Sequence, residues 1–253
     1  MEFMRALCTG ELRWVLLEEA GLFWINGDLF GEWVRGEEVA CLAGIRFLSP
    51  CQPTKIIAVG LNYSSHAEEM GRPLPKEPVL FLKPPSSVVG HRDNVIYPRH
   101  LSLRVEYEGE LAVVIGRRGR RIPREVASEY VFGFTCANDV TARDLQRRDV
   151  QWTRAKGFDT FCPLGPAIAA GIEPSSLTLT TRVNGRIRQK ASTSEMIFPV
   201  DQLISYVSLV MTLEPGDVVL TGTPAGVGEL RPGDVVEVEI EGIGTLTNSV
   251  VEA

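Results

Sequence analysis

The chain has 253 residues, of which 44% are hydrophobic and 23% are charged, and this composition is sufficient for a globular protein with a substantial core. The length permits one large domain, or a large domain with a small one. The net charge of −6 and the pI near 5.3, without a basic stripe, argue against binding to nucleic acids or to anionic membranes.

The N-terminus lacks the basic segment and apolar core of a signal peptide, and no run approaches the about 18 apolar residues of a membrane span. The five cysteines are odd in number and have no C-x-x-C spacing, which favours reduced thiols over a disulfide framework or a zinc site. We therefore expect a cytoplasmic protein.

The first 50 residues read as short strands and turns. Residues 12–27, LRWVLLEEAGLFWING, predict a hairpin that turns near Glu19–Gly21. The two prolines in residues 49–55 indicate a linker. This pattern predicts a small N-terminal domain over residues 1–52 that contains β-strands, followed by a larger domain over residues 53–253.

In the larger domain, apolar runs predict strands over 56–63, 78–84 and 105–115, and Ser64 or Ser65 caps a short helix over 64–70. Residues 123–133 predict a helix that begins at a proline. Residues 134–149 predict a strand followed by a turn and a helix. The pair Asn184–Gly185 predicts the turn of a hairpin. The spacing of apolar residues in 205–213 predicts a helix. PGDVV, at 215–219 and 232–236, reads as a turn leading into a strand. The mixed order, with more strand than helix, predicts an α+β, β-rich fold.

The segment 104–116, RVEYEGELAVVIG, carries Glu106, Glu108 and Glu110 at alternate positions. In one strand these side chains would share a face at a spacing of roughly 7 Å. Such carboxylates could be solvated, could serve as the acid and nucleophile of a glycosidase, or could bind a hard divalent cation. Ala112 and Val114 share this face, which must therefore enter the protein and favours the metal interpretation.

Other segments offer partners for these carboxylates. Asp139 follows a predicted strand and could be a third ligand or the cap of a helix that begins near Thr141. His66 and Glu69, at positions i and i+3, share a helical face. The histidine could be a ligand, a base oriented by Glu69, or a surface residue. A zinc site made from all three histidines is improbable.

The sequence also excludes some catalytic classes. No G-x-S-x-G, S-x-x-K or Rossmann fingerprint is present, which argues against a serine hydrolase and against NAD binding. The glycine-rich segment 221–228, TGTPAGVG, lacks the lysine of a P-loop but could hold a substrate carboxylate.

Seven segments in this order resemble the fumarylacetoacetate hydrolase superfamily: VGLNYSSHAEEM, PVLFLKPPSSVVG, YEGELAVVIG, ANDVTARDLQ, WTRAKGFDTFCPLGP, VNGRIRQ and VLTGTPAGVG. The resemblance runs from about residue 55 to the end of the chain. It implies a fold of mixed β-sheets rolled around a metal site, and a homodimer.

The resemblance also implies the site residues by motif position. Glu108, Glu110 and Asp139 fall on the ligands of Mg²⁺, Mn²⁺ or sometimes Ca²⁺, and Glu106 falls on a position that is commonly acidic but is not a ligand. His66 and Glu69 fall on the catalytic dyad, and Lys156 on the site lysine. The pocket-lining and substrate-binding positions fall on Lys83, Arg143, Gln146 and Thr223. No chemistry requires Glu106, and we expect it beyond the rim of the site, in solvent.

The implied reaction is conversion of a 2-oxo or 2-hydroxydienoic dicarboxylic acid through a metal-stabilised enolate. Lys156 would add positive charge beside the enolate oxygen, and His66 would activate water or move a proton. The segment RAKGFDTFCPLGP is most similar to the bacterial 2-hydroxyhepta-2,4-diene-1,7-dioate isomerase/decarboxylase branch. Alternatives are a C–C hydrolase of acylpyruvate or fumarylacetoacetate, an oxaloacetate decarboxylase, a non-catalytic metal-binding paralogue, and a glycosidase that needs no metal.

Overall fold

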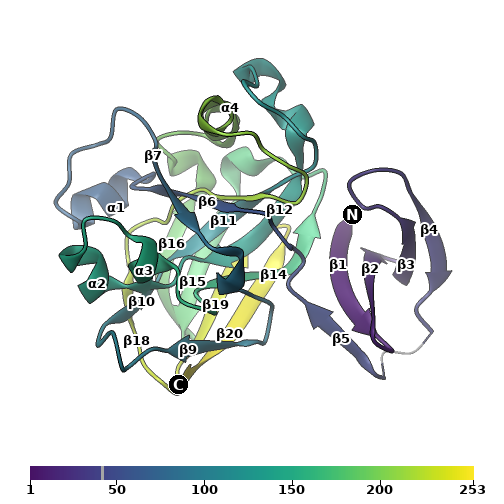
Figure 1. Ribbon diagram of the computed structural model, residues 1–253, viewed down its shortest axis with the longest axis horizontal. Helices are drawn as coiled ribbons and strands as arrows, with labels where there is room; N and C mark the ends of the chain where they lie inside the picture. Colours follow the sequence, from purple (N-terminus) through teal and green to yellow (C-terminus); the bar gives the residue numbers. More distant parts are fainter. Residues whose placement is uncertain (41–42) are drawn as a thin grey trace.

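The computed structural model describes residues 1–40 and 43–253 and is built mainly from β-strands (Figure 1). In this part of the chain the largest sheet runs in the order β4-β3-β2-β1-β14-β12-β11-β17-β6-β7, with β5 beside β1 and β8 beside β14. Its strands are β1 (Glu2–Cys8), β2 (Glu11–Glu18), β3 (Gly21–Gly27), β4 (Trp33–Glu38), β5 (Ile45–Leu48), β6 (Ile56–Gly60), β7 (Val79–Lys83), β8 (Val88–Val89), β11 (Gly109–Ile115), β12 (Val131–Asn138), β14 (Cys162–Ala169) and β17 (Val218–Leu220).

Two smaller sheets complete the β-structure of the described residues. One has the order β13-β10-β18, with β10 (Val105–Tyr107), β13 (Thr141–Ala142) and β18 (Gly228–Leu230). The other has the order β16-β15-β19-β20-β9, with β9 (Asn94–Tyr97), β15 (Thr178–Val183), β16 (Arg186–Ser192), β19 (Val235–Ile240) and β20 (Gly244–Glu252). The predicted α+β, β-rich fold is confirmed.

The helices are short. The α-helices are α1 (Ser64–Glu69), α2 (Arg143–Arg148), α3 (Thr153–Lys156) and α4 (Val200–Val210), and the 3₁₀-helices are η1 (Pro85–Ser87), η2 (Arg124–Tyr130), η3 (Pro174–Ser176) and η4 (Thr193–Glu195). The predicted serine cap of α1 is wrong, because the helix begins after Tyr63 without a side-chain cap. Residues 123–133 form η2 and the start of β12, and α4 begins five residues earlier than predicted, directly after Pro199.

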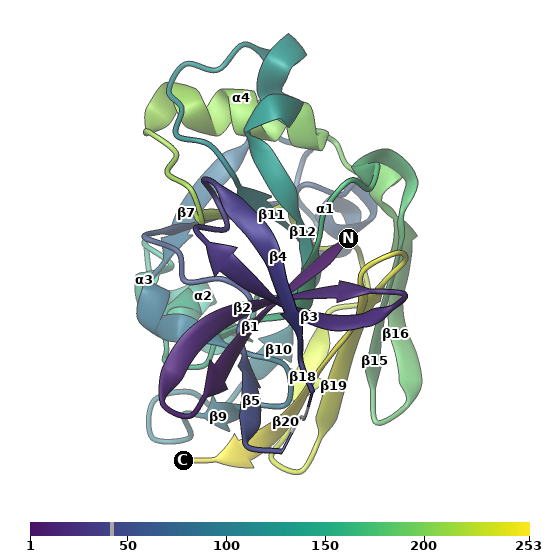
Figure 2. The same ribbon diagram turned by 90° about the vertical axis from the view of Figure 1, so that its right-hand side faces the viewer.

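The N-terminal strands β1–β5 lie at one end of the molecule (Figures 1 and 2). The predicted hairpin is present as β2 and β3, which turn between Glu18 and Gly21. β1 pairs with β14, so these strands are hydrogen-bonded to the main sheet. Phe3 packs against Phe132 of β12 with ring centroids 5.0 Å apart, and their apolar side chains share one core with those of β6 and β11.

The predicted strand over 105–115 is wrong in one respect that matters for the site, because it is two strands in different sheets. β10 pairs with β13 and β18, whereas β11 pairs with β12 and β17. The chain crosses from one sheet to the other at Glu108. Side chains therefore alternate between the two faces within β11, where Ala112 and Val114 are fully buried on the face of Glu110. This alternation does not continue through Glu108 to Glu106, which lies in the other sheet.

Two further expectations concern the whole chain. Across residues 1–40 and 43–253 no helix has both the length and the apolar character that a membrane crossing requires. The described cysteines, Cys8, Cys51, Cys136 and Cys162, are all free thiols, and Cys41 lies outside the described residues.

Candidate metal centre and active site

Three buried carboxylates meet where β10 gives way to β11. Glu108 occupies the break, Glu110 lies on β11, and Asp139 directly follows β12. Each offers an oxygen atom, and these oxygens lie within 4.8 Å of one another. Glu108 is 5% exposed, Glu110 2% and Asp139 1%, so the like charges gather away from water. Such a set of hard oxygen donors suits a divalent cation.

The backbone fixes the spacing of this triad. The Glu108 N–H donates to Asn138 Oδ1 at 3.0 Å, and the Asp139 N–H donates to the Glu108 carbonyl at 2.8 Å. Gly109, between the two glutamates, approaches β15 so closely that a Cβ atom would lie 2.1 Å from Thr181 Oγ1. The glycine is therefore required by this contact, and it brings the carboxylates of both flanking residues into one site.

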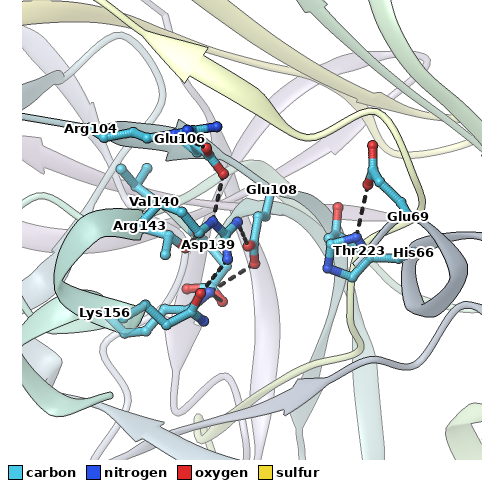
Figure 3. A network of polar contacts seen from close by, with 12 residues as sticks. His66, Glu69, Arg104, Glu106, Glu108, Asp139, Val140, Arg143, Lys156 and Thr223 are labelled. Carbon is cyan, nitrogen blue, oxygen red and sulfur yellow. Dashed lines mark hydrogen bonds and ion pairs between the residues drawn. The ribbon is translucent and has the colours of Figure 1, made fainter. Parts of the chain in front are cut away.

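Two lysines bind the carboxylates directly, and one of them, Lys156, is labelled in Figure 3. Lys156 Nζ donates to Glu108 Oε2 at 2.8 Å and to Asp139 Oδ2 at 2.6 Å. Lys83 Nζ donates to Asp139 Oδ1 at 2.5 Å and to the Val140 carbonyl at 3.3 Å. Both ammonium groups are buried. Lys83, which was predicted to line the substrate pocket, therefore contacts a carboxylate of the triad.

Arg143, the first residue of α2, is the third buried cation. Its Nη2 donates to Glu108 Oε1, and its Nη1 donates to Gln146 Oε1. Its Nε donates to Glu106 Oε2 at 2.6 Å. Glu106 also accepts from Arg104 Nε at 2.7 Å. The expectation that Glu106 lies in solvent is therefore wrong, since its side chain is only 3% exposed and binds two arginines.

The electrostatic environment differs sharply between the two glutamates of the triad. Burial alone would raise the pKa of Glu108, but the charges of Lys156 and Arg143 hold it well below the ordinary value. Burial raises the pKa of Glu110 well above its ordinary value, and the negative charges of Asp139 and Glu108 raise it further. Within the described residues Glu110 has no ion pair, and its one hydrogen bond comes from the Gly222 N–H at 2.7 Å.

The dyad predicted on α1 has formed. His66 Nδ1 lies 3.2 Å from Glu69 Oε2, and the Gly226 N–H donates to Glu69 Oε1 at 3.0 Å. His66 is 5% exposed and close enough to Glu108 to lower the pKa of that carboxyl. Figure 3 shows Glu108 between the cationic cluster and the dyad. An imidazole oriented by a carboxylate is the arrangement of a general base.

The loop of residues 221–228 is held against Gly109 at the start of β11. Thr223 Oγ1 donates to the Gly109 carbonyl and accepts from Gln189 Nε2, both at 2.8 Å. Gln189 Oε1 in turn accepts from the Gly109 N–H at 3.0 Å. Sequence reasoning assigned Thr223 but missed Gln189, although VNGRIRQ was among the quoted motifs. The sequence offers one indication, a polar residue at position 189 in a strand of the predicted hairpin. Only the structure shows that Gln189 is buried and links Gly109 to Thr223.

The structure thus brings the predicted residues into one region. Four carboxylates, those of Glu106, Glu108, Glu110 and Asp139, are matched there by three buried cations, Lys83, Arg143 and Lys156, and by the half-exposed Arg104. Asp139 binds lysines, and the alternative of a helix cap is wrong because α2 begins after Ala142. Glu110 is the carboxylate of this set that has no ion pair among the described residues, and together with Glu108 and Asp139 it offers the hard oxygen donors that a divalent cation prefers.

Comparisons with known proteins agree with this geometry. The family described as fumarylacetoacetate (FAA) hydrolase C-terminal matches residues 55–251. The oxaloacetate tautomerase YisK of Bacillus subtilis is 42% identical over 254 residues, which cover 92% of this chain and 84% of that protein. The structure of a 2-hydroxyhepta-2,4-diene-1,7-dioate isomerase from Mycobacterium marinum is 42% identical, with a TM-score of 0.90, and covers 100% of this chain and 98% of its own.

A third relative carries ligands. The fumarylpyruvate hydrolase of Pseudomonas aeruginosa, whose structure is in complex with Mn²⁺ and pyruvate, is 36% identical with a TM-score of 0.76, and covers 79% of this chain and 91% of its own. The family uses divalent metals, and the triad of this chain could bind one. The matched length, the identities and the shared fold lead to one conclusion: the chain belongs to the fumarylacetoacetate hydrolase family.

Proposed function

We propose that the protein is a divalent-metal-dependent enzyme that shifts a proton between carbon and oxygen in 2-oxo or 2-hydroxydienoic dicarboxylic acids, with Mg²⁺ or Mn²⁺ as the cofactor. The observation that carries the proposal is the placement of three buried carboxylates beside an oriented histidine and a buried lysine. The finer assignment, a 2-hydroxyhepta-2,4-diene-1,7-dioate isomerase/decarboxylase, is supported by the similarity to the M. marinum isomerase.

A cation held by Glu108, Glu110 and Asp139 would supply Lewis acidity to the oxygen atoms of a 2-oxo acid. The residues of the chain supply the rest. Lys156 keeps its proton, because the charges of Asp139 and Glu108 outweigh burial and raise its pKa. Its ammonium group therefore remains a positive charge next to the site at which an enolate oxygen gains negative charge.

His66 is the group that moves the proton. Glu69 binds the imidazole at Nδ1, so that Nε2 is the nitrogen that accepts a proton from one carbon and returns it to another atom of the same substrate. Arg143 and Gln146 on α2 bind a carboxylate of the substrate, and the loop around Thr223 limits the space on the opposite side. His66, Lys156 and the three carboxylates are buried, which would limit water at the reacting atoms and favour proton return over hydrolysis.

A second candidate is the tautomerisation of oxaloacetate, which the similarity to YisK and to the bovine mitochondrial oxaloacetate tautomerase FAHD2A favours. It needs the same residues, because the proton again moves between a carbon next to the 2-oxo group and its oxygen. Decarboxylation of oxaloacetate and hydrolysis of acylpyruvate use the same enolate but break a C–C bond. The substrate therefore decides between these reactions.

A substrate panel separates these reactions. The full-length protein is assayed with a hydroxydienoate diacid, enol oxaloacetate and acetylpyruvate, in Mn²⁺ or Mg²⁺ and after treatment with a chelator. We expect isomerisation without CO₂ or pyruvate release as the fastest reaction, and its loss in chelator. Release of pyruvate from acetylpyruvate as the fastest reaction would favour the hydrolase. Measurable Mn²⁺ affinity without any turnover would favour the non-catalytic paralogue, and full activity in chelator contradicts the proposal.

The role of the dyad is tested by His66→Asn. We expect kcat to fall by about 100- to 10,000-fold, as for loss of a general base, with the Mn²⁺ affinity unchanged. His100→Asn is the matched control, because His100 is exposed in the turn that follows β9. Equal activity of both variants would show that His66 moves no proton.

A further inference from the structure

Glu106 is a buried carboxylate for which the proposed chemistry has no direct use. It belongs to β10, where it pairs with Thr141 of β13 and with Glu229 of β18. Its oxygens divide between two arginines, with Oε1 bound to Arg104 and Oε2 to Arg143. Glu106 is absent from the group of carboxylates close enough together to share a cation. A carboxylate that is buried and ion-paired on both sides is costly to keep, which suggests a function.

The contacts of Arg143 indicate what Glu106 does. Its side chain is 2% exposed, and each of its three nitrogens is engaged, with Glu106, with Glu108 and with Gln146. Two carboxylates therefore share one guanidinium group. Glu108 is also bound by Lys156 and is a candidate metal ligand, so its charge is divided among several cations. Glu106 has Arg143 as its only buried cationic partner among the described residues.

The backbone makes this pair rigid. The Arg143 N–H donates to the Arg104 carbonyl at 2.8 Å, so the first residue of α2 is fixed to the strand that carries Glu106. The ion pair at Nε fixes the guanidinium plane as well, because an arginine held at Nε cannot rotate freely about its last bonds. The Nη2 atom is thereby directed at the site that holds the triad.

We propose that Glu106 is a positioning residue that holds Arg143 for a carboxylate of the substrate. The inference rests on the proposed function, in which Arg143 binds that carboxylate. A cation bound by Glu108 would compete with Arg143 for this carboxylate, and Nη2 would then be available to an anion. Glu106 keeps the guanidinium group in place at this stage. Without Glu106, Arg143 is held by Glu108 and Gln146 alone and loses the orientation that binding needs.

The test uses the full-length protein loaded with Mn²⁺ and oxalate as the probe, because oxalate carries adjacent oxygen atoms like a 2-oxo acid in its enolate form. Calorimetry measures oxalate affinity, electron paramagnetic resonance measures Mn²⁺ affinity, and kinetics on the best substrate of the panel give KM and kcat. We expect Glu106→Ala to weaken oxalate binding and raise KM by about 10- to 100-fold, the scale of a misplaced binding group. Mn²⁺ affinity should fall by less than the roughly 10- to 100-fold that loss of a direct partner of a ligand causes, since the printed partners of Glu106 are arginines and not triad residues.

Two further variants keep the result interpretable. Glu106→Gln preserves an oxygen for Arg143 Nε and should retain most of the oxalate affinity even if Glu106→Ala unfolds. Arg104→Gln removes the half-exposed partner on the other oxygen and should leave oxalate binding unchanged. If Glu106 acts through Arg143, the double variant Glu106→Ala, Arg143→Gln binds oxalate no more weakly than Arg143→Gln alone.

The outcomes distinguish the two proposals. Oxalate binding to the Mn²⁺-loaded wild type with unchanged affinity in both Glu106 variants overturns the positioning role and leaves the proposed function standing. A parallel loss of Mn²⁺ affinity also overturns it, because Glu106 would then support the metal site in general. Failure of the Mn²⁺-loaded wild type to bind oxalate contradicts the proposed function, and with it the positioning role.

Discussion

The two sides of the Glu108 break are electrostatic opposites. On the β10 side, Glu106 and Glu108 each contact two cations, and each of their carboxylate oxygens accepts from an arginine or a lysine. On the β11 side, Glu110 is equally buried but receives one peptide N–H and faces the negative charges of its neighbours. The first half of the site is balanced by the protein itself. In the second half Glu110 has no ion pair among the described residues, and this difference makes it the carboxylate that a bound metal would stabilise most.

The largest expected effect is on metal binding in Glu110→Gln. The substitution removes the uncompensated ligand, and we expect Mn²⁺ affinity to fall by more than the roughly 10- to 100-fold that loss of an outer partner causes. Activity should fall with it. In the metal-free protein at a pH above the raised pKa of Glu110, the same change removes a like charge from the buried cluster, so the melting temperature should rise there. Calorimetric titration and thermal unfolding in chelator measure the two effects, and a lower melting temperature would contradict the comparison.

Glu108→Gln should have the opposite effect on the metal-free protein. It leaves Lys156 and Arg143 buried with one partner fewer, and breaking a buried pair in this way costs about 3–5 kcal/mol of unfolding free energy. Urea unfolding in chelator measures the loss. Glu214→Gln is the control, because its pair with Arg118 is far more exposed and should cost no more than about 1 kcal/mol. Equal losses in both variants would show that Glu108 is not specially compensated.

The smallest effect is a pH dependence set by Glu110. Its pKa is raised in the metal-free protein, whereas a glutamate in the unfolded chain titrates near about 4.3. Between these two values the folded protein holds a proton that the unfolded chain has lost, so the stability of the metal-free protein falls as the pH rises through this window. Binding of Mn²⁺ requires the carboxylate and should release this proton.

Calorimetry in buffers of different ionisation enthalpy counts the proton that Mn²⁺ displaces. We expect up to one proton per ion below the raised pKa of Glu110, a smaller number as the pH increases, and weaker Mn²⁺ binding as the pH falls. Proton release that does not depend on pH would mean that Glu110 is already ionised in the metal-free protein. The two sides of the break would then be less different than the structure indicates.

The local sequence determined much of this protein. Alternating and continuous apolar runs identify the strands, and the Asn184–Gly185 pair correctly marks the hairpin of β15 and β16. Ordered motifs identify the family and name the carboxylates that meet in the structure. Short-range patterns could do this because strand propensity, turn residues and ligand spacing are all encoded within a few neighbouring residues.

Only the tertiary structure decided which partners Glu106, Glu108 and Glu110 have. Strand periodicity treats them as three equivalent carboxylates on one face, and the family resemblance separates Glu106 from the two expected ligands without showing what it contacts. In the fold the chain changes sheets at Glu108, and Arg143, Lys156 and Gln189 arrive from distant segments to bind this region. A carboxylate's ionisation and its partners depend on burial and on charges brought in by such long-range contacts, which no local pattern contains.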